Sequence, residues 1–441
     1  MRGLILNRNS ERVIYMAILI QNGRVIDPAS KRDQQADVLI DGDRIVKMAP
    51  GIPADKSMET IDAAGCLVLP GLVDIHVHFR EPGREEAETI IGGSMVAAKS
   101  GYTSVCTMPN TSPVIDNQAL VRFIKMEAEM GPINVFPVAA VTRGSMGQEL
   151  TEMGELVNGG AVAFSDDGRP VENSLTMRRA LEYARMLQVP IIQHAEDLTL
   201  SKDGIMNEGE NSIVLGLKGI PREAEEVMIA RDVILTRLAG SRLHVAHVSS
   251  RGSVDIITNA KEQGIQVTCE TAPHYFSLTD EAVGEQLSMA KMNPPLRTEE
   301  DRKGIIEALK KGTIDVIATD HAPHINNEKM QEIGYAPFGI IGLETAVPLI
   351  ITVLVRENGF SYMEAFDKVT INPSSILNLD RGELKEGGFA DIAIINPDKK
   401  VTIDEDFILS RCKNTPFLGR ELYGSVEYTI CSGRVVYPFS R

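Results

Sequence analysis

The sequence predicts an α/β protein, a (β/α)₈ TIM barrel with a small β-sandwich domain formed from both chain ends. The first observation is a repeated order of short apolar segment, polar turn and long helical pattern that begins at Leu72, as in parallel βα units. The second is that eight such units fit in roughly three hundred residues, the size of a barrel. The third is that both chain ends carry short strand patterns without helices between them, which favours one separate β domain.

Eight short apolar runs bounded by turn residues are expected to be the barrel strands. They lie at 72–76, 102–108, 134–140, 161–165, 190–194, 243–247, 265–270 and 314–319. The stretches 173–187 and 223–238 between them show helical patterns. We therefore assign residues 71–384 to the barrel.

The chain ends are β-patterned instead. Their strand patterns lie at 17–20, 36–40 and 44–48 near the N-terminus and at 390–395, 426–430 and 435–437 near the C-terminus. The turns at 21–23 and 41–43 are expected to close hairpins. The simplest arrangement joins residues 16–70 and 385–441 in one β-sandwich domain. Residues 1–15 are expected to form a poorly ordered extension.

The composition excludes several classes of protein. The chain has 441 residues, of which 43% are hydrophobic, and a formal net charge of -16, which disfavours nucleic acid and anionic membrane surfaces as partners. Its five cysteines lack C-x-x-C spacing and are odd in number, which argues against a disulfide framework. No signal peptide or membrane span is recognisable, so we expect a cytoplasmic protein.

The eight histidines are confined to a few short stretches. His76 and His78 lie two residues apart at the end of the first predicted strand, so both side chains point to one face and can bind one metal ion. The alternative is a pair of interior histidines that only pack. Similar polar residues follow four other predicted strands, namely Asp166 and Asp167, His194, His244 and His247, and Asp320 and His321.

This distribution favours the metal site. In barrel enzymes the chemistry lies at the C-terminal ends of the strands, and five strands here direct His or Asp side chains to that end. Imidazole and carboxylate ligands without thiolate suit Zn²⁺ or a similar divalent ion. The sequence therefore predicts a catalytic metal centre at the mouth of the barrel.

Four motifs resemble those of the amidohydrolase superfamily, and within it the dihydroorotases of bacterial class I. They are DIHVHFREPG at 74–83, TMPNT at 107–111, KMNPPLR at 291–297 and ATDHAPH at 318–324, which Lys329 follows. The first is shared with neighbouring cyclic-amide hydrolases, whereas the last is more specific to dihydroorotases. The resemblance implies the reversible closure of N-carbamoyl-L-aspartate to dihydroorotate in pyrimidine biosynthesis.

The resemblance also implies a set of metal ligands. His76 and His78 would bind a first zinc ion, His194 and His247 a second, and Asp320 would be both a ligand and the general base. Interior packing is the alternative for these histidines, and a helix N-cap is the alternative for Asp320. His244 precedes His247 by three residues and so faces the opposite side of its strand; we expect it to pack or to support a ligand.

The fourth strand distinguishes the subfamilies. Many superfamily members bridge two ions with a carbamylated lysine at this strand, but no lysine occurs between Lys125 and Lys202. A carboxylate can bridge in its place, and the resemblance assigns this role to Asp167. Asp166 is the competing assignment, and a site with one metal ion remains open.

The residues that the resemblance implies for substrate binding are His78, Arg80, Asn110, Asn293, His324, Phe338 and Gly339. Arg80 lies two residues after His78 and offers a planar donor pair to a substrate carboxylate. A surface ion pair is the alternative for Arg80, and turn or loop positions are the alternative for the others. Residues 325–336 are interpreted as a lid or as a plain surface loop. No role is assigned to His274 or His321.

Two other functions are kept as alternatives. One is another cyclic-amide hydrolase, such as a dihydropyrimidinase, hydantoinase or allantoinase; the missing lysine argues against the first two, and Arg80 favours an acidic substrate. The other is a non-catalytic homologue that supports aspartate transcarbamoylase, although all expected ligands are present. The resemblance implies a homodimer and leaves assembly with aspartate transcarbamoylase open.

Overall fold

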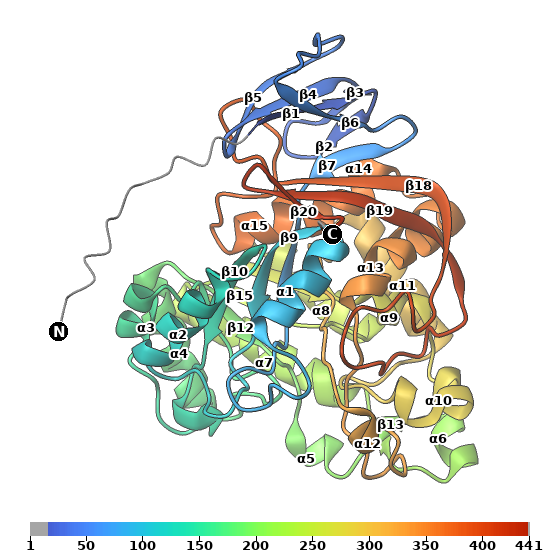
Figure 1. Cartoon of the computed structure of the whole chain (residues 1–441). Coiled ribbons are helices and arrows are strands. Elements are labelled where there is room, and N and C mark those ends of the chain that lie inside the picture. Colours follow the sequence, from blue (N-terminus) through green and yellow to red (C-terminus); the bar gives the residue numbers. More distant parts are fainter. Residues whose placement is uncertain (1–15, 440–441) are drawn as a thin grey trace, which may run out of the picture.

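The computed structural model describes residues 16–439, so the predicted extension at 1–15 lies outside the described residues. Figure 1 shows a barrel of strands surrounded by helices, with a second group of strands packed on one end. The barrel sheet contains eight parallel strands in sequence order. They are β8 (Leu72–Val77), β9 (Tyr102–Thr107), β10 (Asn134–Ala139), β11 (Ala163–Phe164), β12 (Ile191–Gln193), β15 (Leu243–Val245), β16 (Val267–Thr271) and β17 (Val316–Ile317). Each strand overlaps its predicted segment, which confirms the predicted barrel.

The barrel closes between its last and first strands through a few specific contacts. Val77 and His321 form an isolated parallel bridge, and the backbone N–H of His78 donates to the carbonyl of His321 at 2.9 Å. The buried carboxylate of Asp74 accepts the backbone N–H of Thr319 at 3.2 Å. This closure places the end of β8 beside the segment that follows β17, which contains Asp320.

The predicted helices at 173–187 and 223–238 are α4 (Ser174–Leu187) and α7 (Glu223–Ala239). Asn173 caps α4 by accepting the N–H groups of Leu175 and Thr176, which satisfies donors without a partner in the helix. Its buried residues are spaced by three and four positions, as one helical face requires; they are Met177, Ala180, Leu181 and Ala184.

The remaining elements complete the barrel and its loops. The longer helices are α1 (Ile90–Lys99), α2 (Gln118–Ala128), α3 (Met153–Gly159), α8 (Arg251–Glu262), α11 (Glu299–Lys311) and α13 (Leu343–Leu349), which a π-helical stretch (Ile350–Glu357) continues. Short helices are α5 (Leu198–Ser201), α6 (Glu210–Leu215), α9 (Pro273–Ser277), α10 (Glu281–Gln286), α12 (Asn326–Lys329), α14 (Tyr362–Phe366) and α15 (Ile371–Ile376). The short strands β13 (Met206–Asn207) and β14 (Gly219–Ile220) pair with each other.

The strands of the two chain ends form two sheets above the barrel (Figure 1). One has the order β5-β4-β1-β6 and the other the order β20-β19-β18-β7-β2-β3. Their bounds are β1 (Ala17–Gln21), β2 (Arg24–Asp27), β3 (Arg32–Gln35), β4 (Asp37–Asp41), β5 (Arg44–Ala49), β6 (Met58–Asp62), β7 (Leu67–Pro70), β18 (Ile392–Thr402), β19 (Glu421–Cys431) and β20 (Arg434–Tyr437). Because β7 pairs with β18, the two chain ends share one sheet. The boundaries 16–70, 71–384 and 385–441 stay a prediction.

The six-stranded sheet is buried on both faces. Val68 and Ile394 belong to the core shared with the four-stranded sheet, whereas Leu69 and Ile395 belong to the core shared with the barrel. Successive side chains of a strand point to opposite faces, so burial on both sides requires an uninterrupted apolar run. This requirement explains the runs at 66–69 and 392–395.

One predicted hairpin is wrong. The turn at 21–23 connects β1 to β2, and these strands belong to different sheets. Asn22 adopts a left-handed conformation, with φ of 63°, and carries the chain from one sheet to the other. The turn at 41–43 does close a hairpin, between β4 and β5.

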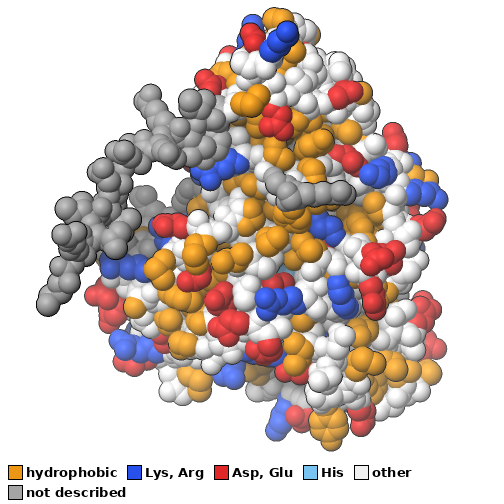
Figure 2. Space-filling view, viewed as in Figure 1, with side chains coloured by type: hydrophobic (Ala, Val, Ile, Leu, Met, Phe, Trp, Pro, Cys, Tyr) orange, Lys and Arg blue, Asp and Glu red, His pale blue; other side chains and the backbone are white. Residues whose placement is uncertain are grey.

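Two observations concern long apolar helices and the charge distribution on one face of the molecule. Among residues 16–439, no helix is both long and apolar enough to cross a bilayer. On the face shown in Figure 2, Lys and Arg side chains are interspersed with Asp and Glu side chains and form no continuous basic area.

Candidate metal centre

A cavity of about 230 Å³ opens at the C-terminal ends of the barrel strands. Its lining residues are His78, Arg80, Asn110, Asp167, Gly168, His194, His247, Asn293, Asp320, Ala322, His324, Phe338 and Gly339. Of the residues predicted for the site, His76 alone is absent from this lining, and it lies buried next to it. The structure thus brings together the residues assigned to metal or substrate, whereas Asp166, the competing assignment for the fourth strand, lies outside the lining.

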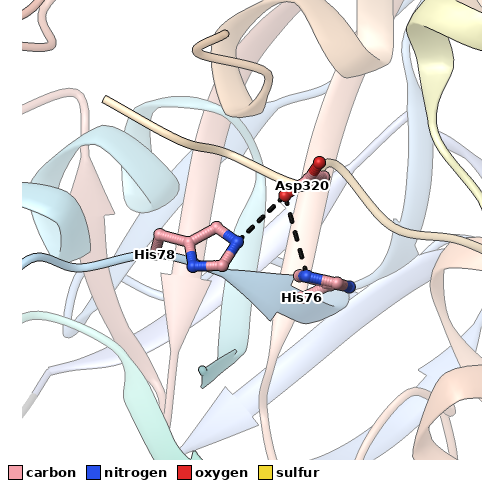
Figure 3. Close-up of side chains that lie close together, drawn as sticks. All are labelled: His76, His78 and Asp320. Atoms are coloured by element: carbon pink, nitrogen blue, oxygen red, sulfur yellow. Dashed lines mark hydrogen bonds and ion pairs between the residues drawn. The ribbon is translucent and has the colours of Figure 1, made fainter. Parts of the chain in front are cut away.

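The first half of the cluster joins the two ends of the barrel sheet. His76 and His78 extend from the end of β8 toward Asp320, which follows β17 (Figure 3). Oδ1 of Asp320 lies 3.0 Å from Nε2 of His78 and 3.6 Å from Nε2 of His76. Asp320 has a φ of 49° and His247 a φ of 35°, values that cost energy for residues with a side chain and are concentrated at functional sites.

Asp167 lies between the two pairs of histidines. Its Oδ1 is 3.4 Å from Nε2 of His76, 3.6 Å from Nδ1 of His194 and 3.4 Å from Nε2 of His247. Its Oδ2 is 3.5 Å from Nε2 of His78. The neighbouring Asp166 points elsewhere and accepts the backbone N–H of Thr142 at 3.0 Å. Of the two aspartates after β11, Asp167 therefore has the position that a bridging carboxylate needs.

These donor atoms fit divalent metal ions. Nε2 of His76 and Oδ1 of Asp167 are buried and lack a hydrogen-bond partner among the described residues, although a buried polar atom without a partner is costly. Ligands about 2.1 Å from a tetrahedral zinc ion lie about 3.4 Å from one another, close to the separations above. The residues present can thus hold metal in this cluster.

Protons compete with a metal ion for the same atoms. Burial opposes the protonated form of His194, but the close contacts with the carboxylates of Asp167 and Glu196 outweigh it and raise its pKa to about 10. Burial likewise opposes ionisation of Asp167, yet the charge of His76 and the close contacts with His194 and His247 hold its pKa well below its usual range. A metal ion that binds here must displace protons from the imidazoles.

Two glutamates that the sequence reasoning missed support the histidines. Oε1 of Glu270, on β16, lies 2.5 Å from Nδ1 of His76, and its Oε2 lies 3.2 Å from Nε2 of His244. Oε2 of Glu196 lies 3.1 Å from Nε2 of His194. A carboxylate on the far nitrogen of an imidazole orients the ring and raises its basicity. The available signal for Glu270 was an acidic residue within a predicted barrel strand.

Glu270→Gln is expected to weaken zinc binding about ten- to a hundredfold, because the amide orients His76 less firmly than the carboxylate does. The measurement is a zinc competition titration with a chromophoric chelator on the metal-free protein. Glu344→Gln is the matched control, since Glu344 is equally buried but bonds to Lys99 and Leu409. Unchanged zinc affinity in Glu270→Gln would show that this contact does not support the centre.

The predicted substrate residues occupy the wall of the cavity. Nε of Arg80 donates to the carbonyl of Pro323 at 3.2 Å, and Nη2 lies 3.3 Å from Nε2 of His324. Oδ1 of Asn110 lies 2.9 Å from Nδ1 of His78, so Asn110 also orients a candidate ligand. The amide nitrogen of Asn293 donates to Glu196 at 2.9 Å, which holds this side chain beside His194.

Three histidines stay outside the cluster. His244 is buried between Thr268 and Glu270, in agreement with the expectation that it packs or supports a ligand. Nδ1 of His321 accepts the backbone N–H of Gly342 at 3.2 Å, and burial with the nearby charge of Arg80 lowers its pKa to about 3. Burial also lowers the pKa of His274 to about 4. Both rings are therefore neutral at physiological pH.

Comparisons with known proteins agree with this geometry. Residues 65–253 match the family model described as dihydro-orotase-like, and residues 305–437 match the amidohydrolase family. The chain is 52% identical to a dihydroorotase of Pelobacter propionicus and 53% identical to one of Geobacter metallireducens, with 96% of this chain and 100% of each relative covered.

Solved structures of related enzymes have the same fold. One is a dihydropyrimidinase from Brevibacillus agri, with a TM-score of 0.84, 25% identity and 95% of both chains covered. Another is an L-hydantoinase from Arthrobacter aurescens, with a TM-score of 0.86, 24% identity and 96% of both chains covered.

Proposed function

The chain belongs to the dihydroorotase family of amidohydrolases, and from this premise we propose that it catalyses the reversible closure of N-carbamoyl-L-aspartate to dihydroorotate and water. One observation carries the proposal: four imidazoles and two carboxylates from five strand ends meet at a cavity whose wall also contains Arg80. Such convergence at the C-terminal end of a barrel is typical of catalytic sites.

We propose two zinc ions as the metals of this centre, with His76 and His78 at the first, His194 and His247 at the second, and Asp167 between them. Asp320 would be a further ligand of the first ion. The support is the position of Asp167, whose carboxylate oxygens lie 3.4 to 3.6 Å from all four imidazoles. When bound, the metal supplies an acidified water molecule and polarises the amide carbonyl.

The residues of the chain orient the substrate and move the proton. Asp320 lines the cavity beside His78, so its carboxylate can hold the proton that passes between water and the ring nitrogen. Burial and the nearby Arg84 lower the pKa of Arg80 to about 10, so its guanidinium is charged at neutral pH. A partly buried guanidinium in this wall favours a substrate with a carboxylate. Asn110, Asn293, His324, Phe338 and Gly339 are proposed to contact the rest of the substrate.

A panel of cyclic amides tests the function. The zinc-loaded protein is expected to open dihydroorotate and to leave dihydrouracil and allantoin nearly unchanged, because only dihydroorotate carries a carboxylate for Arg80. Loss of the dihydroorotate absorbance and chromatography of the other two rings measure turnover, and chelator-treated protein is the control. Opening of dihydrouracil or allantoin without dihydroorotate would favour another cyclic-amide hydrolase, and no turnover of any ring would favour the non-catalytic alternative.

Assembly of the chain stays a prediction. We propose a homodimer, supported by three exposed apolar residues on one face of α7, Val227, Ile234 and Leu238. Association with aspartate transcarbamoylase and a cytoplasmic location are retained as expectations.

A further inference from the structure

Lys329 is a fully buried lysine at the end of α12, beside the cavity but outside its lining. Its Nζ donates to three backbone carbonyls, those of Lys291 at 2.9 Å, Pro337 at 2.9 Å and Gly339 at 2.7 Å. An ammonium group has three N–H donors, and the three carbonyls accept one hydrogen bond from each of them. Lys329 therefore anchors the segment 325–336, most of which is exposed, to the cavity wall.

The three carbonyls belong to two segments that form the cavity wall. Lys291 lies two residues before Asn293, and Pro337 and Gly339 flank Phe338; Asn293, Phe338 and Gly339 all line the cavity. The N–H of Gly339 also donates to the carbonyl of Lys291 at 3.0 Å. Lys329 thus joins the segment that carries Asn293 to the segment that carries Phe338 and Gly339.

A second lysine holds the same region from another direction. Nζ of Lys291 donates to the carbonyls of Ile333 at 2.7 Å and Ala336 at 2.7 Å, and it lies 4.4 Å from the centre of the Phe338 ring. The carbonyl of Phe338 in turn lies 2.8 Å from Nε2 of His324. The backbone from 333 to 339 is therefore bound at several points by two ammonium groups and a histidine.

Burying a lysine without a carboxylate partner is costly. Burial, with the nearby Lys291, lowers the pKa of Lys329 to about 7, and its hydrogen bonds go to uncharged carbonyls. A methionine would fill a similar volume without this desolvation cost. Unlike methionine, the ammonium group donates hydrogen bonds that join two segments of the cavity wall.

We propose that Lys329 is a positioning residue that sets substrate affinity by holding the Asn293 and Phe338–Gly339 segments together at the cavity wall. This inference rests on the proposed function, because it assigns these segments to the same substrate. Lys329 itself does not line the cavity and takes no part in the proton transfer.

The test is Lys329→Met, which keeps the volume and removes the donors. We expect KM for dihydroorotate to rise about tenfold or more, while kcat stays within about threefold and zinc content is unchanged. We also expect faster hydrogen exchange of the backbone amides at 333–341. Lys368→Met is the matched control, because Lys368 is also buried but pairs with Asp367; it is expected to change neither KM nor that exchange.

Unchanged KM and unchanged exchange in Lys329→Met would overturn the proposal, and so would a loss of thermal stability without a change in KM. If Lys329→Met does not fold, Lys291→Met replaces it with the same readouts, and unchanged KM and exchange there would also overturn the proposal. Hydrogen exchange needs no substrate. If the wild type does not open dihydroorotate, the proposed function fails, whereas the exchange data still report whether Lys329 holds these segments.

Discussion

Asp320→Asn is expected to lower kcat for dihydroorotate opening by about a hundred- to ten-thousandfold, the usual contribution of a general base. The amide cannot accept the proton that the carboxylate accepts, although its shape is the same. Zinc content is expected to stay nearly intact, because Asp167 and the four imidazoles remain. The measurements are steady-state kinetics and metal analysis of the same preparation.

Asp74→Asn is the matched control for this substitution. Asp74 is buried within β8 and accepts the backbone N–H groups of His76 and Thr319, but it does not line the cavity. Its amide keeps an acceptor oxygen, so kcat is expected to stay within about tenfold of the wild type. Activity of Asp320→Asn close to the wild-type value would remove Asp320 as the base.

Asp167→Asn is expected to lower zinc content below two ions per chain and to reduce kcat by about a thousandfold. An amide cannot offer two anionic oxygens to two cations, and the charge stabilisation that metal supplies is worth several kcal/mol, with about 1.4 kcal/mol for each factor of ten in rate. The measurements are metal analysis after dialysis against zinc and turnover of dihydroorotate.

Asp166→Asn distinguishes the two neighbouring aspartates. Asp166 bonds to Thr142 and points away from the histidines, so this variant is expected to keep its zinc. The opposite result, with zinc lost from Asp166→Asn and retained by Asp167→Asn, would reverse the assignment. Wild-type protein that binds one ion per chain at saturation would instead favour the single-metal site.

Most of the barrel could be predicted because each strand is a local apolar run that is readable without its neighbours. The same holds for His76 and His78, whose spacing alone places both rings on one face. Strand pairing is not a local property. The turn at 21–23 was predicted to close a hairpin, but the strands on either side of it pair with other strands in different sheets. A short turn between two strands has the same sequence signature whether the strands pair or enter different sheets.

The supporting residues escaped prediction for a related reason. Glu270 contacts His76 across a sequence separation of 194 residues, and a single glutamate in a strand pattern does not indicate which histidine it meets. The role of Lys329 depends on carbonyl groups of Lys291, Pro337 and Gly339, and backbone groups leave no mark on a sequence.

The sequence by itself determined the fold class, the approximate positions of the barrel strands and the crowding of histidines near their C-terminal ends, because periodicity and residue type are local properties. Only the tertiary structure placed Asp167 among the four imidazoles and Asp166 against Thr142, paired Glu270 with His76, and set Lys329 beside the cavity wall. These outcomes depend on which atoms meet when the barrel closes, and closure brings together residues that no local pattern connects.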